Sequence, residues 1–224
     1  MVAPYDPTCL LDLRMLPYMD GATQRIRDFS GRGVLATPTG FAGTDVEYVD
    51  GCCGQGIAIT NPKRLVCGQV LNYTFESFTF EMVLIVNVLL PGGDPVLFWK
   101  GNFTVNGYYM QISNAGAIAF MTNQGGALQQ TNTNAGCFKI GNVQHIIVTR
   151  DGARVRIYYN GTETAYGATG VHISPTTSAN DLLISTYGGG GNGIEGTVFT
   201  AKSWVRCLGA SEVWERYIAS GRGV

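Results

Sequence analysis

Two Xaa-Gly dipeptides, nine residues apart, constrain the fold of this chain more than any other sequence feature. Asp151-Gly152 and Asn160-Gly161 both have the composition of a two-residue β-hairpin turn, in which positive φ angles favour Asn, Asp and Gly. The residues between them alternate with the period of a strand, with Val155, Ile157 and Tyr159 on one side and Arg154, Arg156 and Tyr158 on the other. Residues 143–166 therefore predict a three-stranded antiparallel meander.

The rest of the chain is also typical of short strands joined by tight turns. Glycine accounts for 31 of the 224 residues, and only 14% of the residues are charged. Hydrophobic patterns and flanking turn residues predict further strands at 78–86, 96–100, 108–113, 117–122, 181–187 and 196–206. Asn106-Gly107 and residues 114–116 are expected to be turns between these strands.

One helix is predicted near the end of the sequence. Ser211 can cap this helix, Glu212 suits its first turn and Gly221 can terminate it. The apolar stripe of the helix would be Val213, Trp214, Tyr217 and Ile218. No change in composition marks a domain boundary, so we expect one all-β domain over residues 1–224, a sandwich or jelly roll with a short C-terminal helix.

Charge and hydropathy argue against nucleic-acid binding and against a membrane-spanning helix. Lys and Arg number 15 against 16 Asp and Glu, and a net charge of −1 does not suit binding to nucleic acid by bulk electrostatics. The longest apolar stretch, residues 82–90, is about half of the ~18 residues that a membrane-spanning helix needs. Residues 1–13 lack the basic start and unbroken apolar core of a secretory signal, so we expect synthesis in the cytoplasm.

The six cysteines form no Cys-x-x-Cys pair, and only His145 and His172 are available beside them, so no zinc ligand set is recognisable. In a reducing compartment they are expected to be buried free thiols, although an even number leaves disulfide pairing open. The cysteines are Cys9, Cys52, Cys53, Cys67, Cys137 and Cys207.

Three stretches in a fixed order carry a family resemblance: residues 28–33 (DFSGRG), residues 145–161, which include HIIVTRDG and IYYNG, and residues 196–217. Their order and spacing resemble those of a laminin-G-like domain of the concanavalin A-like lectin/glucanase jelly-roll superfamily. The resemblance implies two antiparallel sheets, one of them concave, with the N- and C-terminal strands side by side. It also implies that His145 is a strand residue with a hydrogen-bonded ring rather than a catalytic base.

Some families with this fold hydrolyse glycans with a Glu-x-Asp-x-Glu strand motif, in which alternate carboxylates share one face. The nearest match here is Asp45-Val46-Glu47 followed by Asp50, which lacks a third carboxylate and precedes a turn. Glu76 and Glu81 are five residues apart and would lie on opposite faces of a strand. Residues 188–193 fit a nucleotide-binding glycine pattern, but a strand follows them rather than a helix. We therefore predict that the chain is not an enzyme.

Modules of this family often bind glycans or proteins at a rim, sometimes through Ca²⁺. The aromatic candidates for a sugar platform are Trp99, Tyr108, Tyr109 and Tyr187, with packing inside the sandwich as the alternative. The calcium candidates are Asp94, Asn102 and Asp181, although they form no recognisable acidic cluster. The sequence thus leaves open whether Ca²⁺ is a cofactor.

Two functions fit these observations. A lectin-like fold without an export signal first suggests a phage or virus particle surface protein, a capsid decoration protein that is made in the cytoplasm and binds a viral shell protein as a homo-oligomer. Residues 1–20 would then be a docking arm, or else an ordinary edge strand. The alternative is a carbohydrate-binding module, extracellular by a route without a signal peptide, that recognises cell-surface or polymeric glycans. A third hypothesis, which the sequence favours less than these two, is a glycoside hydrolase or lyase with an unrecognised active site.

Overall fold

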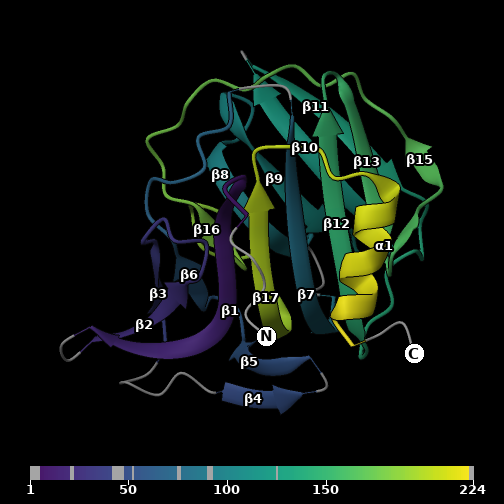
Figure 1. Cartoon of the computed structure of the whole chain (residues 1–224). Helices are drawn as coiled ribbons and strands as arrows, with labels where there is room; N and C mark the ends of the chain where they lie inside the picture. The colour runs from purple at the N-terminus through teal and green to yellow at the C-terminus, as the bar shows by residue number, and fades with distance from the viewer. Residues whose placement is uncertain are drawn as a thin grey trace.

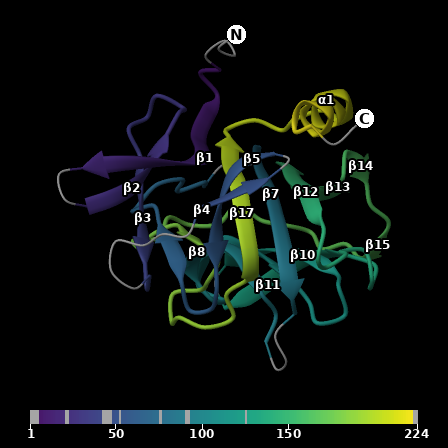
Figure 2. The same ribbon diagram turned by 90° about the horizontal axis from the view of Figure 1, so that it is seen from below.

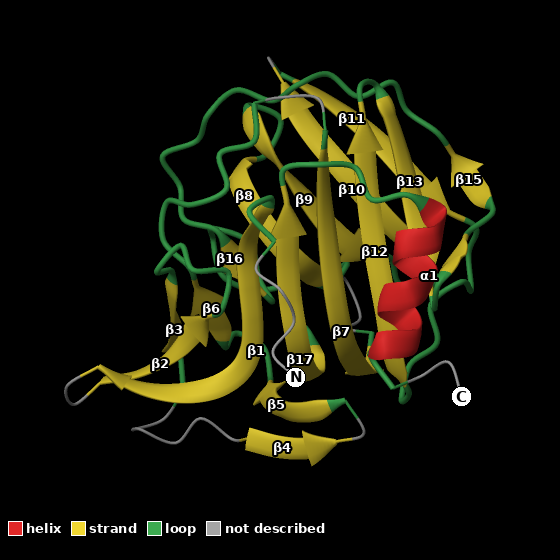
Figure 3. Cartoon of the chain, in the orientation of Figure 1, coloured by secondary structure: helices red, strands yellow, loops and turns green. Residues whose placement is uncertain are grey.

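The computed structural model describes residues 6–20, 23–41, 48–51, 53–74, 77–89, 93–124 and 126–221. These residues form short antiparallel strands and one helix, α1 (Ala210–Ala219), as Figures 1 and 3 show. The strands are β1 (Cys9–Asp20), β2 (Thr23–Asp28), β3 (Leu35–Thr39), β4 (Tyr48–Gly51), β5 (Gly54–Ile59), β6 (Arg64–Val66), β7 (Phe78–Val88), β8 (Val96–Asn102), β9 (Asn106–Ile112), β10 (Ile118–Gln124), β11 (Ala127–Thr133), β12 (Val143–Asp151), β13 (Arg154–Tyr159), β14 (Thr162–Glu163), β15 (Tyr166–Ala168), β16 (Leu183–Ile184) and β17 (Glu195–Trp204).

The strands form two facing sheets, which confirms the predicted all-β sandwich (Figure 2). The front sheet has the order β14–β13–β12–β7–β17–β1–β2, and the β4–β5 hairpin pairs with the first half of β17. The back sheet has the order β15–β11–β10–β9–β8–β16–β6–β3. Strand β3 pairs with β2 as well as β6, so the two sheets are joined along this side.

The meander predicted from the two Xaa-Gly turns is confirmed as β12, β13 and β14. Asp151 pairs with Arg154 across the first turn, where Gly152 has a φ of 60°. Asn160 and Gly161 have φ values of 50° and 81°, the left-handed conformation that the second turn requires. Residues 28–33 also form a turn, in which the Asp28 carboxylate accepts hydrogen bonds from the backbone N–H and the hydroxyl of Ser30 at 2.9 and 2.5 Å.

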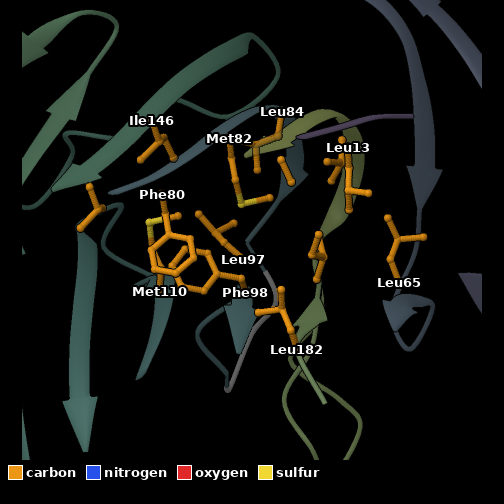
Figure 4. Packing of buried hydrophobic residues seen from close by; sticks show 14 of the residues in the cluster. Leu13, Leu65, Phe80, Met82, Leu84, Leu97, Phe98, Met110, Ile146 and Leu182 are labelled. Atoms are coloured by element: carbon orange, nitrogen blue, oxygen red, sulfur yellow. The ribbon is translucent and has the colours of Figure 1, made fainter. Parts of the chain in front are cut away.

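Hydrophobic residues that alternate along the facing strands fill the space between the sheets (Figure 4). Phe80 of β7 contacts Phe98 of β8 with 4.3 Å between ring centroids, so this contact joins the two sheets. Tyr108 lies 5.0 Å from Phe80, and its hydroxyl donates to the carbonyl of Leu71 at 2.6 Å. Because that hydroxyl has a partner, the tyrosine can be buried without the cost of an unmade hydrogen bond.

Helix α1 lies on the outer face of the front sheet, beside β12 and β14 (Figures 1 and 2). It begins two residues earlier than predicted, with Gly209 rather than Ser211 at the N-cap. Glu212 takes the place of a capping side chain, because its carboxylate accepts the Gly209 backbone N–H at 3.0 Å. Only Val213 of the predicted stripe is buried, whereas Trp214 is 49% exposed.

Other local predictions also need correction. Asn106-Gly107 lies in β9, and residues 103–105 form the turn. The strand expected at 181–187 shortens to β16, since Ser185 has a φ of 81° and interrupts the extended chain. The first half of strand β1, Cys9 to Leu13, pairs with β17, and its second half, from Leu13 to Asp20, pairs with β2, so whether this segment docks on a neighbour stays a prediction. No described helix has both the length and the apolar character needed to cross a membrane.

Five of the six cysteines lie among the described residues. Cys9 and Cys67 are buried free thiols, as expected, and Cys137 and Cys207 are free thiols that are partly buried. Burial raises the pKa of Cys67 to about 12, so this thiol stays protonated. Cys52 lies outside the described residues, as do Asp45, Glu47, Glu76 and residues 1–5, so the predictions that fall on them are not addressed by the fold.

His172 connects a long irregular segment to the back sheet. Its ring nitrogens Nδ1 and Nε2 lie 2.9 Å from the hydroxyls of Thr122 in β10 and Thr131 in β11, respectively. The ring is 1% exposed and faces Phe120 at 5.8 Å. His172 is therefore a structural residue of the core and not a catalytic or metal-binding one.

The burial of His172 predicts a pH dependence of stability. Desolvation, assisted by the charge of Arg150, lowers the pKa of His172 from 6.5 to about 4. The unfolded chain therefore binds a proton that the folded chain does not bind between these two pH values. We expect the free energy of unfolding to fall by about 3 kcal/mol as the pH drops across this window. Urea unfolding of the wild type and His172→Gln at a series of pH values tests this, because the glutamine cannot titrate. Parallel pH profiles for the two proteins would contradict it.

Candidate functional site

The outer face of the back sheet carries a cluster of aromatic side chains. Along β8, Phe98 points into the core and Trp99 points to the opposite face. The register places Tyr109 of β9 on one side of Trp99 and Leu183 of β16 on the other. The Trp99 ring lies 4.8 Å from Tyr109 and 6.0 Å from Tyr187, and its indole N–H donates to the Gly101 carbonyl at 2.7 Å. Trp99 is thus held firmly as the floor of this face.

Two pockets open beside this cluster, with volumes of about 530 and 280 Å³. Trp99, Phe103 and Tyr187 line both pockets, so the two are adjacent parts of one surface depression, which we call the aromatic groove. The larger part is also lined by Asn102, Asn180 and Asp181, and the smaller part by Asp94, Gln111 and Asn192. Amides and carboxylates therefore surround a central aromatic wall, a combination typical of small-molecule sites.

Two loops supply the rest of the aromatic wall, with Phe103 exposed and Tyr187 partly buried. Phe103, in the β8–β9 turn, is 56% exposed and lies 6.0 Å from the Tyr109 ring. Tyr187 precedes a glycine run that folds back on it, since the Gly190 N–H donates to the Tyr187 carbonyl at 3.0 Å. A Cβ at Gly189 would lie only 2.6 Å from the Tyr187 ring, so this close approach requires glycine.

Hydrogen bonds fix the polar groups at both ends of the groove. The Asp94 carboxylate accepts from Gln111 Nε2 at 2.7 Å and from the Asn114 backbone N–H at 3.2 Å. Burial, with the Asp94 charge, raises the pKa of Tyr109 to about 12, so its hydroxyl stays neutral. At the other end, Asn180 Nδ2 donates to the Gly101 carbonyl at 2.7 Å. These polar side chains are positioned before any ligand arrives.

Behind this end of the groove, Lys100 donates to the Asn180 carbonyl. Burial lowers the pKa of Lys100, and the nearby carboxylate of Asp181 opposes this effect only in part. The lysine side chain is 1% exposed, so it supports the loop rather than contacting a ligand.

The structure brings together three of the four predicted aromatic residues: Trp99, Tyr109 and Tyr187. Tyr108 is not among them, because it points into the core from the other face of β9. Sequence reasoning missed Phe103, although its place between two strands, within Asn102-Phe103-Thr104, marks it as an aromatic residue in a turn.

The predicted calcium residues lie in the groove but do not form one ligand set. Asp94 lines the smaller part, whereas Asn102 and Asp181 line the larger part. Within the described ranges, no three His, Cys, Asp or Glu side chains come together in a way that could hold a metal ion. Ca²⁺ prefers six to eight oxygen ligands, so these residues do not fit a calcium centre.

These features define a lectin-like β-sandwich with a ligand-sized groove on one face. The model of the Concanavalin A-like lectin/glucanases superfamily matches residues 61–214, and the chain belongs to this superfamily. The resemblance seen in the sequence is thereby confirmed. No curated protein matches the chain at the level of sequence.

Solved structures share the fold at low sequence identity. The binding domain of Paraclostridial Mosquitocidal Protein 1 matches with a TM-score of 0.72 and 16% identity, over 95% of this chain and 52% of that one. A structure of botulinum neurotoxin type C, described as entering cells through interaction with two ganglioside molecules, matches with a TM-score of 0.68, 13% identity, and coverage of 95% and 51%. The chain therefore spans about half the length of these toxin domains.

A third structure matches over nearly its whole length. It is domain 4 of AbnA, an extracellular arabinanase from Geobacillus stearothermophilus, in complex with arabinotriose. The TM-score is 0.64 and the identity 13%, over 84% of this chain and 90% of that domain. At these identities the likeness establishes the fold alone.

The separation of Asp94 from Asp181 predicts that Ca²⁺ does not stabilise the domain. A ligand that binds only the folded state raises the melting temperature, and the rise grows with the logarithm of ligand concentration above Kd. We therefore expect the same melting temperature in millimolar Ca²⁺ and in a chelator, measured by calorimetry, with Mg²⁺ as the control for ionic strength. A rise with Ca²⁺ that Asp181→Asn abolishes would restore the calcium site expected from the sequence.

Proposed function

We propose that this chain is a non-catalytic carbohydrate-binding domain that holds a glycan in the aromatic groove. The observation that carries the proposal is the aromatic wall of exposed Phe103 and partly buried Tyr187 over Trp99, flanked at both ends by amides and carboxylates. A sugar ring presents apolar C–H faces and a hydroxyl edge, so aromatic rings and hydrogen-bonding side chains are complementary to it.

The comparisons support this proposal better than the capsid decoration role first expected from the sequence. The AbnA domain is in complex with arabinotriose, and the toxin type C structure is described with gangliosides, which are glycolipids. None of the compared structures named here is a virion protein. The virion role, its shell-protein partner and the virion location therefore remain predictions.

The proposal that the groove is non-catalytic rests on its carboxylates. Glycoside hydrolases place two carboxyl groups about 5 to 9.5 Å apart across one glycosidic bond. Here Asp94 and Asp181 line different parts of the groove, and Asp94 is already held by Gln111 and Asn114. Such an arrangement suits binding at both ends of a saccharide rather than cleavage between them.

Phe103 offers the sharpest test, because Val105 in the same turn is a matched control. Both side chains are more than half exposed, at 56% and 53%, but only Phe103 lines the groove. We expect Phe103→Ala to weaken glycan binding by about five- to tenfold, the loss of one aromatic contact, and Val105→Ala to leave it unchanged.

The measurement is a glycan array on the wild type, followed by calorimetric titration of the variants with the best oligosaccharide. Turnover of that oligosaccharide should be undetectable. Equal affinities for Phe103→Ala and Val105→Ala would place the ligand elsewhere, and the absence of any glycan ligand would overturn the proposed function.

A further inference from the structure

A second pocket lies on the opposite face of the sandwich, between the outer face of the front sheet and the last turn of α1. Its volume is about 300 Å³, the size of one small polar molecule. We call it the helix pocket. It is lined chiefly by Glu81 and Val83 of β7, Thr200 and Lys202 of β17, and Arg216 and Ser220 of α1.

Strand register places a row of alternating charges beside this pocket. Asp12 of β1 is paired with Lys202, and Lys202 is paired with Glu81. Arg14 donates two hydrogen bonds, at 2.7 and 3.1 Å, to Oδ2 of Asp12. Lys202 Nζ lies 3.4 Å from Oδ1 of the same carboxylate. Asp12 thus interacts with both Arg14 and Lys202, so it only partly compensates the charge of Lys202.

Glu81 is the one carboxylate that lines the pocket among the described residues, and both of its oxygens are engaged. Oε1 accepts from His145 Nε2 at 3.1 Å, and Oε2 accepts from Arg216 Nη1 at 3.2 Å. Burial raises the pKa of Glu81, but the bond from His145 and the charges of Lys202 and Arg216 outweigh this and keep the pKa below its ordinary value. The carboxylate is therefore charged, and it has little capacity left for a ligand.

The Arg216 guanidinium is held in place on two sides. It lies 3.9 Å above the Trp204 ring and bonds to Glu81. A guanidinium has five N–H donors in a fixed plane, and the bond to Glu81 uses one of them. Arg216 therefore presents a rigid set of donors without a large loss of side-chain entropy on binding.

Three carbonyl groups in the last turn of α1 already accept hydrogen bonds within the helix end. The carbonyls of Arg216 and Ile218 accept the N–H groups of Ser220 and Gly221, both at 3.0 Å, and the Tyr217 carbonyl accepts the Ser220 hydroxyl at 2.7 Å. The helix pocket thus offers two cations against one occupied carboxylate, and it is rich in donors and poor in acceptors.

We propose that the helix pocket binds a small oxyanion, held between Lys202 Nζ and the Arg216 guanidinium. Carboxylate and phosphate groups both match the planar donor set of arginine and the point charge of lysine. The oxyanion is the carboxylate of an acidic sugar or a phosphate group. This site is independent of the aromatic groove and does not require the proposed glycan function.

The experiment is calorimetric titration at constant ionic strength with inorganic phosphate, glucuronate and glucose. Lys202→Gln is compared with Lys139→Gln, a matched variant that removes the same charge from an exposed lysine outside the pocket. We expect the wild type and Lys139→Gln to bind an oxyanion, and Lys202→Gln to bind it about tenfold more weakly, as for the loss of one charged hydrogen bond. Glucose should not bind at this site.

The arms of the titration separate the two sources of the oxyanion. Tighter binding of glucuronate than of phosphate identifies an acidic sugar, and the reverse identifies a phosphate group. Phe103→Ala should leave oxyanion affinity unchanged, so failure of the groove and failure of the helix pocket are distinguishable. Binding of neither anion, equal binding by the two lysine variants, or equal binding of glucose and glucuronate overturns the proposal.

A measurement on the wild type alone tests the proposal even if a variant does not fold. In an NMR titration with phosphate, the indole N–H signal of Trp204 should shift because Arg216 lies on its ring, whereas the signal of Trp99 should not. Shifts of both signals or of neither would count against a specific oxyanion site.

Discussion

The alternation of side chains along β8 links the core of this domain to its candidate ligand site. Phe98 points inward and contacts Phe80 of the front sheet at 4.3 Å, while the next residue, Trp99, forms the floor of the aromatic groove. A shift of the β8 register by one residue would exchange these two faces, removing a core contact and the groove floor together. The stability of the sandwich and the geometry of its groove therefore depend on the same strand pairing.

The strands that sequence patterns identified best are those whose turns are encoded locally. Gly152 in the first turn and Asn160-Gly161 in the second have the positive φ angles that these turns need, and β12 to β14 follow as predicted, although Asp151 is the last residue of β12 rather than part of the turn. Asn106-Gly107 has the same composition but lies within β9, because the neighbouring β8 and β10 determine where that hairpin turns. The early start of α1 has a similar cause, since the bond from Gly209 to Glu212 needs no capping side chain at Ser211.

The aromatic part of the groove could be predicted in large measure, because aromatic residues on short strands have few places to lie. Tyr108 and Tyr109 are adjacent, and only the register with Phe98 and Trp99 determines which of them faces the core. The helix pocket could not be predicted, because its contacts join distant parts of the chain. Glu81 and Arg216 are 135 residues apart, so no local sequence pattern shows that they meet.

The pairing of β1 with β17 has a mechanical consequence. Cys9, at the start of β1, lies opposite Trp204, at the end of β17, and the pairs that follow continue from this end of the ladder. A pulling force applied through the start of β1 and the end of β17 acts on this first pair before it reaches the others. The paired residues of this ladder would separate one after another, instead of all bearing the load together in shear. Tension applied through these two ends would thus separate β1 from β17 at this end first.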